Sequence, residues 1–454
     1  MLSAPPSPLA SPQPILRRFD AIAIIVGIVV GAGIYKTPSL VAAALGSPGW
    51  MLAAWVLGAA VSFVGALCYA ELATTYPNAG GDYHFLTRAF GRELSFLYAW
   101  ARATVINTGS IALLAFVFGD YLSTVAPLGS SSSAAWAAIV VIALTVINVV
   151  GLHASVRTQN ALTLVEVAGL AAVVFAGCVA PPAADSMLPV WGRAPALGDF
   201  GIAMVFVLLT YGGWNEAAYI AAELKGTRRA IVGALFASLA IIAVGYLAMN
   251  GALVAGLGFA GLAASKAPGA DVMARAFGAV GVQALALFVA VATLTSINAT
   301  MIVGARTDFA MGRDWPALRA LGGWNGRRDA PIVAYLVQCA IALALIAFGA
   351  FQHDGFEAMV NFTAPVFWGF FLLVGVALFV LRVRDPGAHR PFRVPLYPFT
   401  PLLFCASCAF LLYSSLTYAA SHDAVHIGLL VMAFGAVALL LTRYASRRSP
   451  PGMP

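Results

Sequence analysis

Two glycine-rich stretches lie inside runs of apolar residues that are long enough to cross a membrane. One is Gly31-Ala32-Gly33, within the apolar run 19–45, and the other is Thr210-Tyr-Gly-Gly-Trp-Asn-Glu216. Each glycine weakens a helix by about 1 kcal/mol. In hydrocarbon, frayed backbone persists only where it is buried in protein or lines a wet cavity. The two stretches therefore predict two interrupted helices whose main-chain groups face such a cavity.

Bare main-chain groups at such interruptions can bind a small dipolar solute. The first turn of a half helix offers N–H groups and a positive dipole end to an anion, and unwound carbonyls can accept hydrogen bonds from an ammonium group. A zwitterionic amino acid needs that combination. For the first stretch alone, a close helix–helix contact through small residues is the alternative.

Ionisable side chains inside the apolar runs are the other candidates for chemistry. Glu166 lies in the middle of one run and Arg102 within another. Such residues are costly in a membrane and are by default functional hypotheses. For Glu166 the structural alternative is a protonated carboxyl group that hydrogen-bonds to a neighbouring helix. Glu71 lies near the end of its run, where we expect turn amides or a loop arginine to bind it.

The elements that position these residues are apolar spans. Of the 454 residues, 61% are hydrophobic and only 9% are charged, which excludes an ordinary soluble domain and indicates an all-α polytopic membrane protein. About twelve runs are long enough to span a bilayer. They centre near Gly31, Val61, Ser110, Val141, Leu170, Thr210, Ile241, Val291, Ile341, Phe370, Leu411 and Leu430.

The net charge of +7 is best explained by orientation in the membrane. With twelve spans and both termini in the cytoplasm, most basic residues outside the spans fall on the cytoplasmic side, whereas the opposite loops hold Arg193 and Lys266. Cytoplasmic loops of membrane proteins are enriched in Lys and Arg in this way. We therefore expect an integral membrane protein that contacts lipid, with both termini in the cytoplasm and no nucleic-acid partner. The expected location is a bacterial inner membrane.

The interrupted spans are the first and the sixth, which is the spacing expected if a five-helix unit is repeated in inverted orientation. Glycine-interrupted spans at corresponding positions of two halves point to a binding site at the membrane midplane. We expect a disordered tail over 1–16, helical units over 17–181 and 198–382, two further helices over 398–444, and a cytoplasmic tail over 445–454.

Several motifs, in order, resemble the amino acid–polyamine–organocation superfamily. Gly31-Ala-Gly-Ile-Tyr with Pro38 resembles its first-helix signature, and Glu71 followed by the segment Tyr76–Tyr83 resembles its second. The segments Asn107–Ala112, Phe118–Tyr121 and Tyr211–Asn215 are similar to the L-type amino acid transporter branch and its bacterial serine/threonine exchangers. The segment Arg390–Pro395 resembles the loop before helix eleven.

The resemblance implies twelve transmembrane helices in a leucine-transporter-like, five-plus-five inverted repeat, with helices 1 and 6 broken and two extra C-terminal helices. It implies a secondary active transporter that works by alternating access. The backbone at Gly31, Ala32 and Gly33 would hold the substrate carboxylate. Carbonyls at Val29, Leu209, Thr210 and Gly212 would hold the amine. The other implied site residues are Ile34, Tyr211, Asn215 and Asn298.

Three positions depart from the family pattern. Ala32 stands where Ser is common, and Leu209 stands where a Phe commonly closes the site. Glu166 stands where many sodium-independent relatives carry a Lys. We hypothesise that Glu166, with Ser296 and the Gly31 carbonyl, holds the proton or the sodium ion that couples transport.

The expected substrate is a small neutral L-amino acid, because the predicted site consists mainly of backbone and of small or apolar groups. Because Glu216 is acidic, a cationic amino acid or polyamine permease of the same fold is the alternative. The sequence does not decide whether transport is exchange or symport, or whether the protein is a monomer or a homodimer. A non-transporting amino acid sensor is the alternative of another class. No catalytic, metal or nucleotide constellation is present, so we expect no enzyme, no cofactor and no metal site.

Overall fold

The computed structural model describes residues 17–78, 80–150, 156–181, 190–220, 230–325, 330–352, 354–421 and 425–448. Within these ranges the chain is helical, apart from short turns and one isolated bridge. The first half contains α1 (Arg18–Val29), α2 (Thr37–Leu45), α3 (Pro48–Thr75), α4 (Gly81–Phe90), α5 (Arg92–Ala101), α6 (Asn107–Ser123), α7 (Ser132–Val150) and α8 (Val156–Val179). The second half contains α9 (Leu197–Thr210), α10 (Ala217–Ile220), α11 (Ala230–Leu257), α12 (Phe259–Ala264), α13 (Pro268–Asp314), α14 (Ile332–Ala350), α15 (Gly355–Arg384), α16 (Phe399–Ser421) and α17 (Val425–Arg448).

Nine helices within the described residues are long and apolar enough to cross a membrane. The first and sixth predicted spans do not meet that criterion because each is divided: α1 is separated from α2, and α9 from α10. The apolar part of α17 is also shorter, covering Leu430–Arg443. The predicted tail over 1–16 lies outside the described residues. Helix α17 continues to Arg448 and so extends into the predicted cytoplasmic tail over 445–454.

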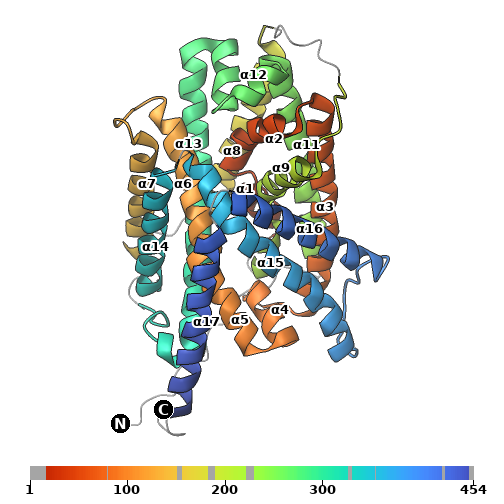
Figure 1. Cartoon of the computed structure of the whole chain (residues 1–454), viewed down its shortest axis with the longest axis vertical. Coiled ribbons are helices and arrows are strands. Elements are labelled where there is room, and N and C mark those ends of the chain that lie inside the picture. Colours follow the sequence, from red (N-terminus) through yellow and green to blue (C-terminus); the bar gives the residue numbers. More distant parts are fainter. Residues whose placement is uncertain are drawn as a thin grey trace.

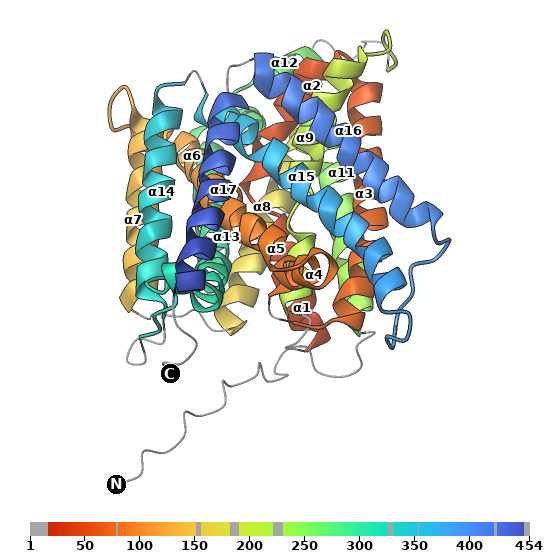
Figure 2. The same ribbon diagram turned by 60° about the horizontal axis from the view of Figure 1, so that its bottom comes forward.

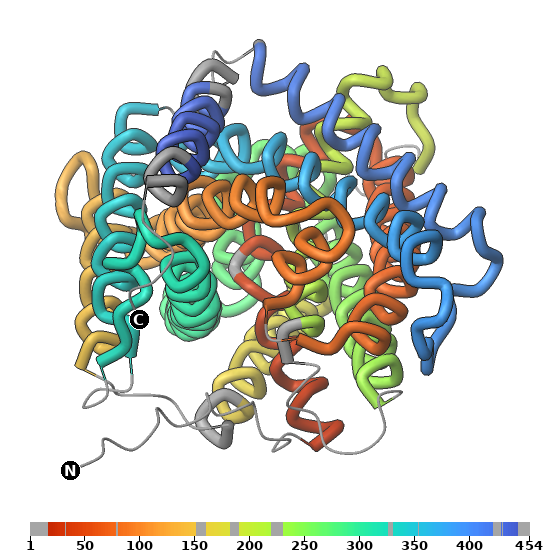
Figure 3. The backbone as a smooth tube through the Cα atoms, turned by 90° about the horizontal axis from the view of Figure 1, so that it is seen from below, coloured from red at the N-terminus to blue at the C-terminus, as the bar shows by residue number. Residues whose placement is uncertain are grey.

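The divided helices lie in the interior of the bundle. Helices α7 and α14 form one edge and α3 and α16 the other, with α1 and α9 between them (Figures 1 and 3). The ends marked by α2 and α12 and by α4 and α5 are opposite each other (Figure 2). We refer to them as the α2 end and the α4 end. This arrangement shields the interrupted backbone from the surroundings, as bare peptide groups at membrane depth require.

Packing at the α4 end is fixed by Glu71, which is buried near the end of α3. Arg382 of α15 donates to both of its carboxylate oxygens, at 2.8 and 2.5 Å. The main-chain N–H of Val394 donates to it at 2.6 Å, and the Arg390 guanidinium lies 3.5 Å away. The prediction that loop groups bind Glu71 is confirmed. One carboxylate thus joins α3, α15 and the segment before α16.

Candidate binding site between the interrupted helices

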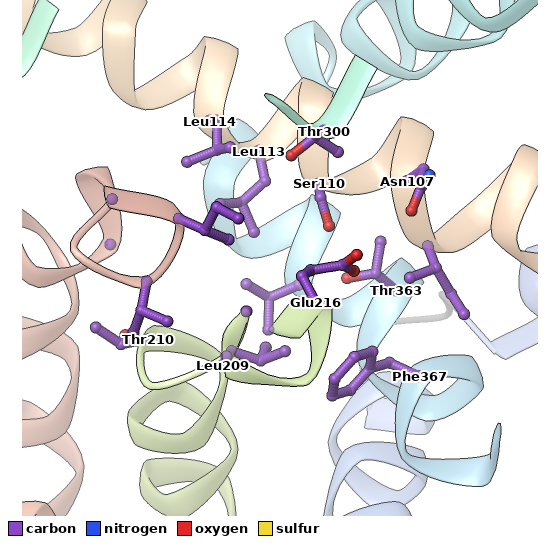
Figure 4. A pocket seen from close by; sticks show the side chains of 18 of the residues that line it. Asn107, Ser110, Leu113, Leu114, Leu209, Thr210, Glu216, Thr300, Thr363 and Phe367 are labelled. Carbon is purple, nitrogen blue, oxygen red and sulfur yellow. The ribbon is translucent and has the colours of Figure 1, made fainter. Parts of the chain in front are cut away.

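A cavity of about 190 Å³ lies where the two interrupted helices meet (Figure 4). This volume is below the roughly 300–1,000 Å³ typical of sites for drug-sized ligands. Most of the residues that the sequence assigns to the substrate line this cavity: Val29, Gly31, Gly33, Leu209, Thr210, Gly212 and Asn215. The cavity therefore suits a small solute that contacts the backbone of both helices.

The first interruption replaces α-helix by a short 3₁₀ turn. Helix α1 ends at Val29, Gly31 is extended (φ −79°, ψ −171°), and the 3₁₀ turn η1 covers Ala32–Tyr35. Helix α2 then begins at Thr37, with Pro38 in its first turn. The first N–H groups of such a turn have no partner within the helix. The side chain of Ala32 lies outside the described part, so only its main chain is placed.

The second interruption depends on Gly213. Helix α9 ends at Thr210, and Gly213 adopts φ 107°, a conformation that side chains disfavour. A Cβ atom at Gly213 would lie 2.9 Å from Cγ2 of Ile28 on α1. The 3₁₀ turn η3 (Trp214–Glu216) then leads into α10. Glycine is therefore needed here both for the backbone conformation and for close contact between the two interrupted helices.

Tyr246 of α11 joins the carboxyl ends of both interrupted helices. Its buried hydroxyl donates to the carbonyl of Val29 at 2.7 Å, and the carbonyl of Thr210 lies 3.1 Å from the same oxygen. The Leu209 carbonyl accepts from the N–H of Gly212 at 3.0 Å. These carbonyls are the predicted acceptors for a substrate amine. Each keeps a second lone pair that could accept such a bond.

Several predicted residues do not face the cavity. Ile34 is fully buried elsewhere. Tyr211 packs against Tyr246, with ring centroids 5.0 Å apart, and so shapes the interruption from behind. The family resemblance places Asn298 beside the site, but its amide oxygen accepts from Asn148 of α7 at 2.7 Å. Thr300 lines the cavity instead, two residues further along α13.

Other lining residues come from α6, α13 and α15. Asn107, Ser110, Thr300 and Thr363 surround the carboxylate of Glu216, and Phe367 closes one side (Figure 4). The sequence could have indicated Asn107, Ser110 and Thr300, because they are polar residues inside the third and eighth apolar runs. The cavity wall opposite the backbone interruptions is thus a mixture of hydroxyl, amide and apolar groups.

Arg102 reaches the cavity because the helix before α6 is wider than an α-helix. Residues Arg102–Ile106 form a π-helical turn, η2, in which the N–H of Asn107 donates to the carbonyl of Arg102. Side chains five residues apart lie on nearly the same face of such a turn. Both Arg102 and Asn107 consequently line the cavity, and π-turns of this kind are frequent at functional sites.

Glu166 is fully buried in α8. Among the described residues, neither of its carboxylate oxygens has a hydrogen bond of good geometry. It faces Thr295 of α13, whose own hydroxyl donates to the Val291 carbonyl at 2.9 Å. A protonated Glu166 could therefore donate to the Thr295 oxygen. Ser296, the other predicted coupling residue, lies 3.3 Å from the Cβ position of Gly31 and does not line the cavity.

An ionic bridge lies on the side of the cavity toward the α2 end. The ammonium of Lys36, between η1 and α2, lies 2.8 Å from Asp120 of α6 and 2.9 Å from Asp354, the N-cap of α15. It also lies 5.2 Å from the ring centroid of Phe356, which lines the cavity. The bridge therefore links the second half of the first interrupted helix to two other helices.

A bundle of apolar helices that encloses a small cavity between two interrupted helices defines an integral membrane protein with a solute site, the architecture of membrane transporters. The model of the amino acid permease family matches residues 16–439, so the chain belongs to that family. It is therefore a transporter and not an enzyme.

Named relatives resemble the chain over most of its length. The human cystine/glutamate transporter is 26% identical over 402 residues, covering 87% of this chain and 79% of the relative. The mouse large neutral amino acids transporter small subunit 2 is 29% identical over 415 residues, covering 87% and 75%. The serine/threonine exchanger SteT of Bacillus subtilis (strain 168) is 27% identical over 399 residues, covering 87% and 90%.

Proposed function

We propose that the protein is a secondary active transporter of small neutral L-amino acids. The observation that carries this proposal is the small cavity between the two interruptions, where backbone groups of both helices meet Asn107, Ser110 and Thr300. Helix-start N–H groups suit the carboxylate and carbonyl oxygens suit the ammonium of an amino acid. The hydroxyl and amide groups suit a short uncharged side chain.

Alternating access is the proposed mechanism, with residues 17–181 and 198–382 as inverted repeats. In support, corresponding helices of the two units pack on each other: α3 on α11, α6 on α13 and α7 on α14. We propose that the Lys36 bridge closes the route from the α2 end, which would be the outer side of a bacterial inner membrane if both termini are cytoplasmic. Basic residues gather at the α4 end and support that orientation: Arg88 of α4, Arg92 of α5, and Arg382 and Arg384 in the last turn of α15.

The coupling residue of the proposal is Glu166. Its burial without a cation in the described surroundings favours a neutral, protonated carboxyl group, because an isolated buried charge is very costly. Binding and release of that proton next to the first interrupted helix would couple a proton gradient to the conformation of the binding site. Exchange of one amino acid for another is the alternative, and the name of the Bacillus subtilis relative favours it.

Uptake into proteoliposomes tests the proposal. The purified protein would be given labelled serine, alanine, leucine, lysine, glutamate and putrescine, with and without internal amino acid and with and without a pH gradient. We expect serine or alanine to be taken up. Putrescine or lysine alone would favour the cationic permease, and binding without uptake of any amino acid would favour a sensor.

The Glu166→Gln variant separates the two forms of coupling. Gln keeps the volume and a hydrogen-bond donor but cannot release a proton. If Glu166 carries the coupling proton, uphill accumulation driven by a pH gradient is lost while exchange of internal for external substrate continues. Unchanged accumulation with unchanged pH dependence would exclude this role. The Glu93→Gln variant, which changes an exposed carboxylate paired with Arg443, is the matched control.

A further inference from the structure

We propose that the Arg102–Glu216 ion pair selects substrates by the charge of their side chain. Among the described lining residues these are the only two that carry a charge. While they are paired, the cavity offers no net charge to a substrate side chain, and neutral side chains are favoured over both acidic and basic ones. This inference rests on the proposed amino acid transport and names the property of the site that would restrict it to neutral substrates.

The geometry of the pair directs it at the cavity. The Nη2 of Arg102 lies 3.0 and 3.2 Å from the two carboxylate oxygens of Glu216. The Arg102 side chain is only 3% exposed, whereas that of Glu216 is 20% exposed. Glu216 points among Ser110, Thr300 and Thr363 (Figure 4). The carboxylate is therefore the half of the pair that a substrate side chain would meet first.

The arginine is held in place from behind, independently of Glu216. Its Nη1 donates to the hydroxyl of Tyr98 at 2.9 Å, and that hydroxyl donates to Asp82 of α4 at 3.1 Å. Asp308 of α13 is also buried and interacts electrostatically with Arg102. The guanidinium would therefore stay beside the cavity if Glu216 lost its charge.

The two partners have opposite expected effects because removal of either charge leaves the other as the single charged residue among the described lining residues. Without the charge of Glu216, the guanidinium of Arg102 is the nearest ionised group to the cavity, and an acidic side chain can replace the lost carboxylate. Without the charge of Arg102, the carboxylate of Glu216 is the only ionised group among the described lining residues, and a basic side chain is favoured. Charge complementarity of this kind acts strongly in a cavity with few competing waters.

Inhibition of labelled serine or alanine uptake by three compounds of similar size and different charge tests the inference. These are asparagine, aspartate and 2,4-diaminobutyrate. In the unmodified protein we expect asparagine to inhibit at a concentration at least tenfold lower than either charged compound. In Glu216→Gln we expect the aspartate-to-asparagine ratio of inhibitory concentrations to fall at least tenfold. In the double variant Arg102→Gln/Glu216→Gln, this gain for aspartate should disappear.

Two results would overturn the inference. One is equal inhibition of the unmodified protein by all three compounds, which needs no variant to fold. The other is a Glu216→Gln protein that elutes and melts as a folded protein but keeps the unmodified ratio within twofold. Glu93→Gln should keep the unmodified order. If the unmodified protein takes up neither serine nor alanine, the proposed function fails first; if it does and only the ratios stay constant, the inference alone fails.

Discussion

Replacing Gly213 by Ala should disable the second interruption, and Gly46→Ala provides a matched control. Both glycines have positive φ, 107° at Gly213 and 66° at Gly46. A side chain costs about 1–2 kcal/mol in such a conformation. At Gly46 the new Cβ meets no atom within 4 Å, so no steric cost is added to this conformational cost.

At Gly213 a second cost is added. The new Cβ would lie 2.9 Å from Cγ2 of Ile28 and 3.4 Å from the Ile28 carbonyl oxygen. Because Ile is branched at Cβ, its side chain rotates little within a helix, and overpacking of this kind costs typically about 1–3 kcal/mol. We therefore expect Gly213→Ala to destabilise the interruption by about 3 kcal/mol, compared with about 1 kcal/mol for Gly46→Ala.

The assay combines melting of the purified protein in detergent with amino acid exchange in proteoliposomes. Gly213→Ala should melt several degrees below Gly46→Ala and should lose most of its exchange activity, because the close contact between α1 and the turn after α9 builds the cavity. Gly46→Ala should keep its activity. Equal melting temperatures and equal activities of the two variants would refute the argument that backbone geometry at Gly213 forms the site.

Three further predictions concern charged groups and use the same melting assay. Glu71→Gln should lower the free energy of unfolding by about 3 kcal/mol or more, because it leaves buried guanidinium groups without their anion. Glu93→Gln changes an exposed pair and should lower it by less than about 1 kcal/mol. Equal losses of stability in the two variants would contradict this prediction. Lys36→Gln leaves Asp120 and Asp354 without their shared cation, so its melting deficit should shrink as salt is added, and a salt-independent deficit would contradict the bridge. Burial raises the pKa of Asp82, on α4 outside the predicted spans, from 3.8 to about 7, against the opposing effect of Arg102. Since the unfolded chain loses this proton near pH 4, the protein should lose stability relative to Asp82→Asn as the pH rises from about 4 to 7, by up to roughly 4 kcal/mol; a pH-independent difference would contradict the shift.

The sequence predicts the interruptions well because glycine inside an apolar run is a local signal. Gly31, Gly33 and Gly213 weaken helices wherever they lie, and a lipid environment makes the consequence severe. The partner of Glu71 could also be predicted in kind, since a carboxylate at a membrane boundary needs donors and the neighbouring loops are rich in arginine.

Other features depend on how helices are rotated and paired, which local patterns do not encode. Asn298 and Thr300 are two residues apart and hence about 200° apart around α13, so both cannot face the cavity. Both are polar residues of the same apolar run, so the sequence alone does not determine which of them faces the cavity. Tyr246 and the pairing of Arg102 with Glu216 join segments that are far apart in the sequence, and their contacts follow only from the packed bundle.

The wide turn η2 makes the position of Arg102 depend on the length of the chain as well as on its composition. Deleting one residue between Ala103 and Val105 would allow a regular α-helix, in which each residue turns the chain by about 100°. The guanidinium would then swing away from Glu216 although both residues were still present. If the Arg102–Glu216 pair selects substrates as proposed, loss of a single codon in this helix would change that selection although both residues are retained.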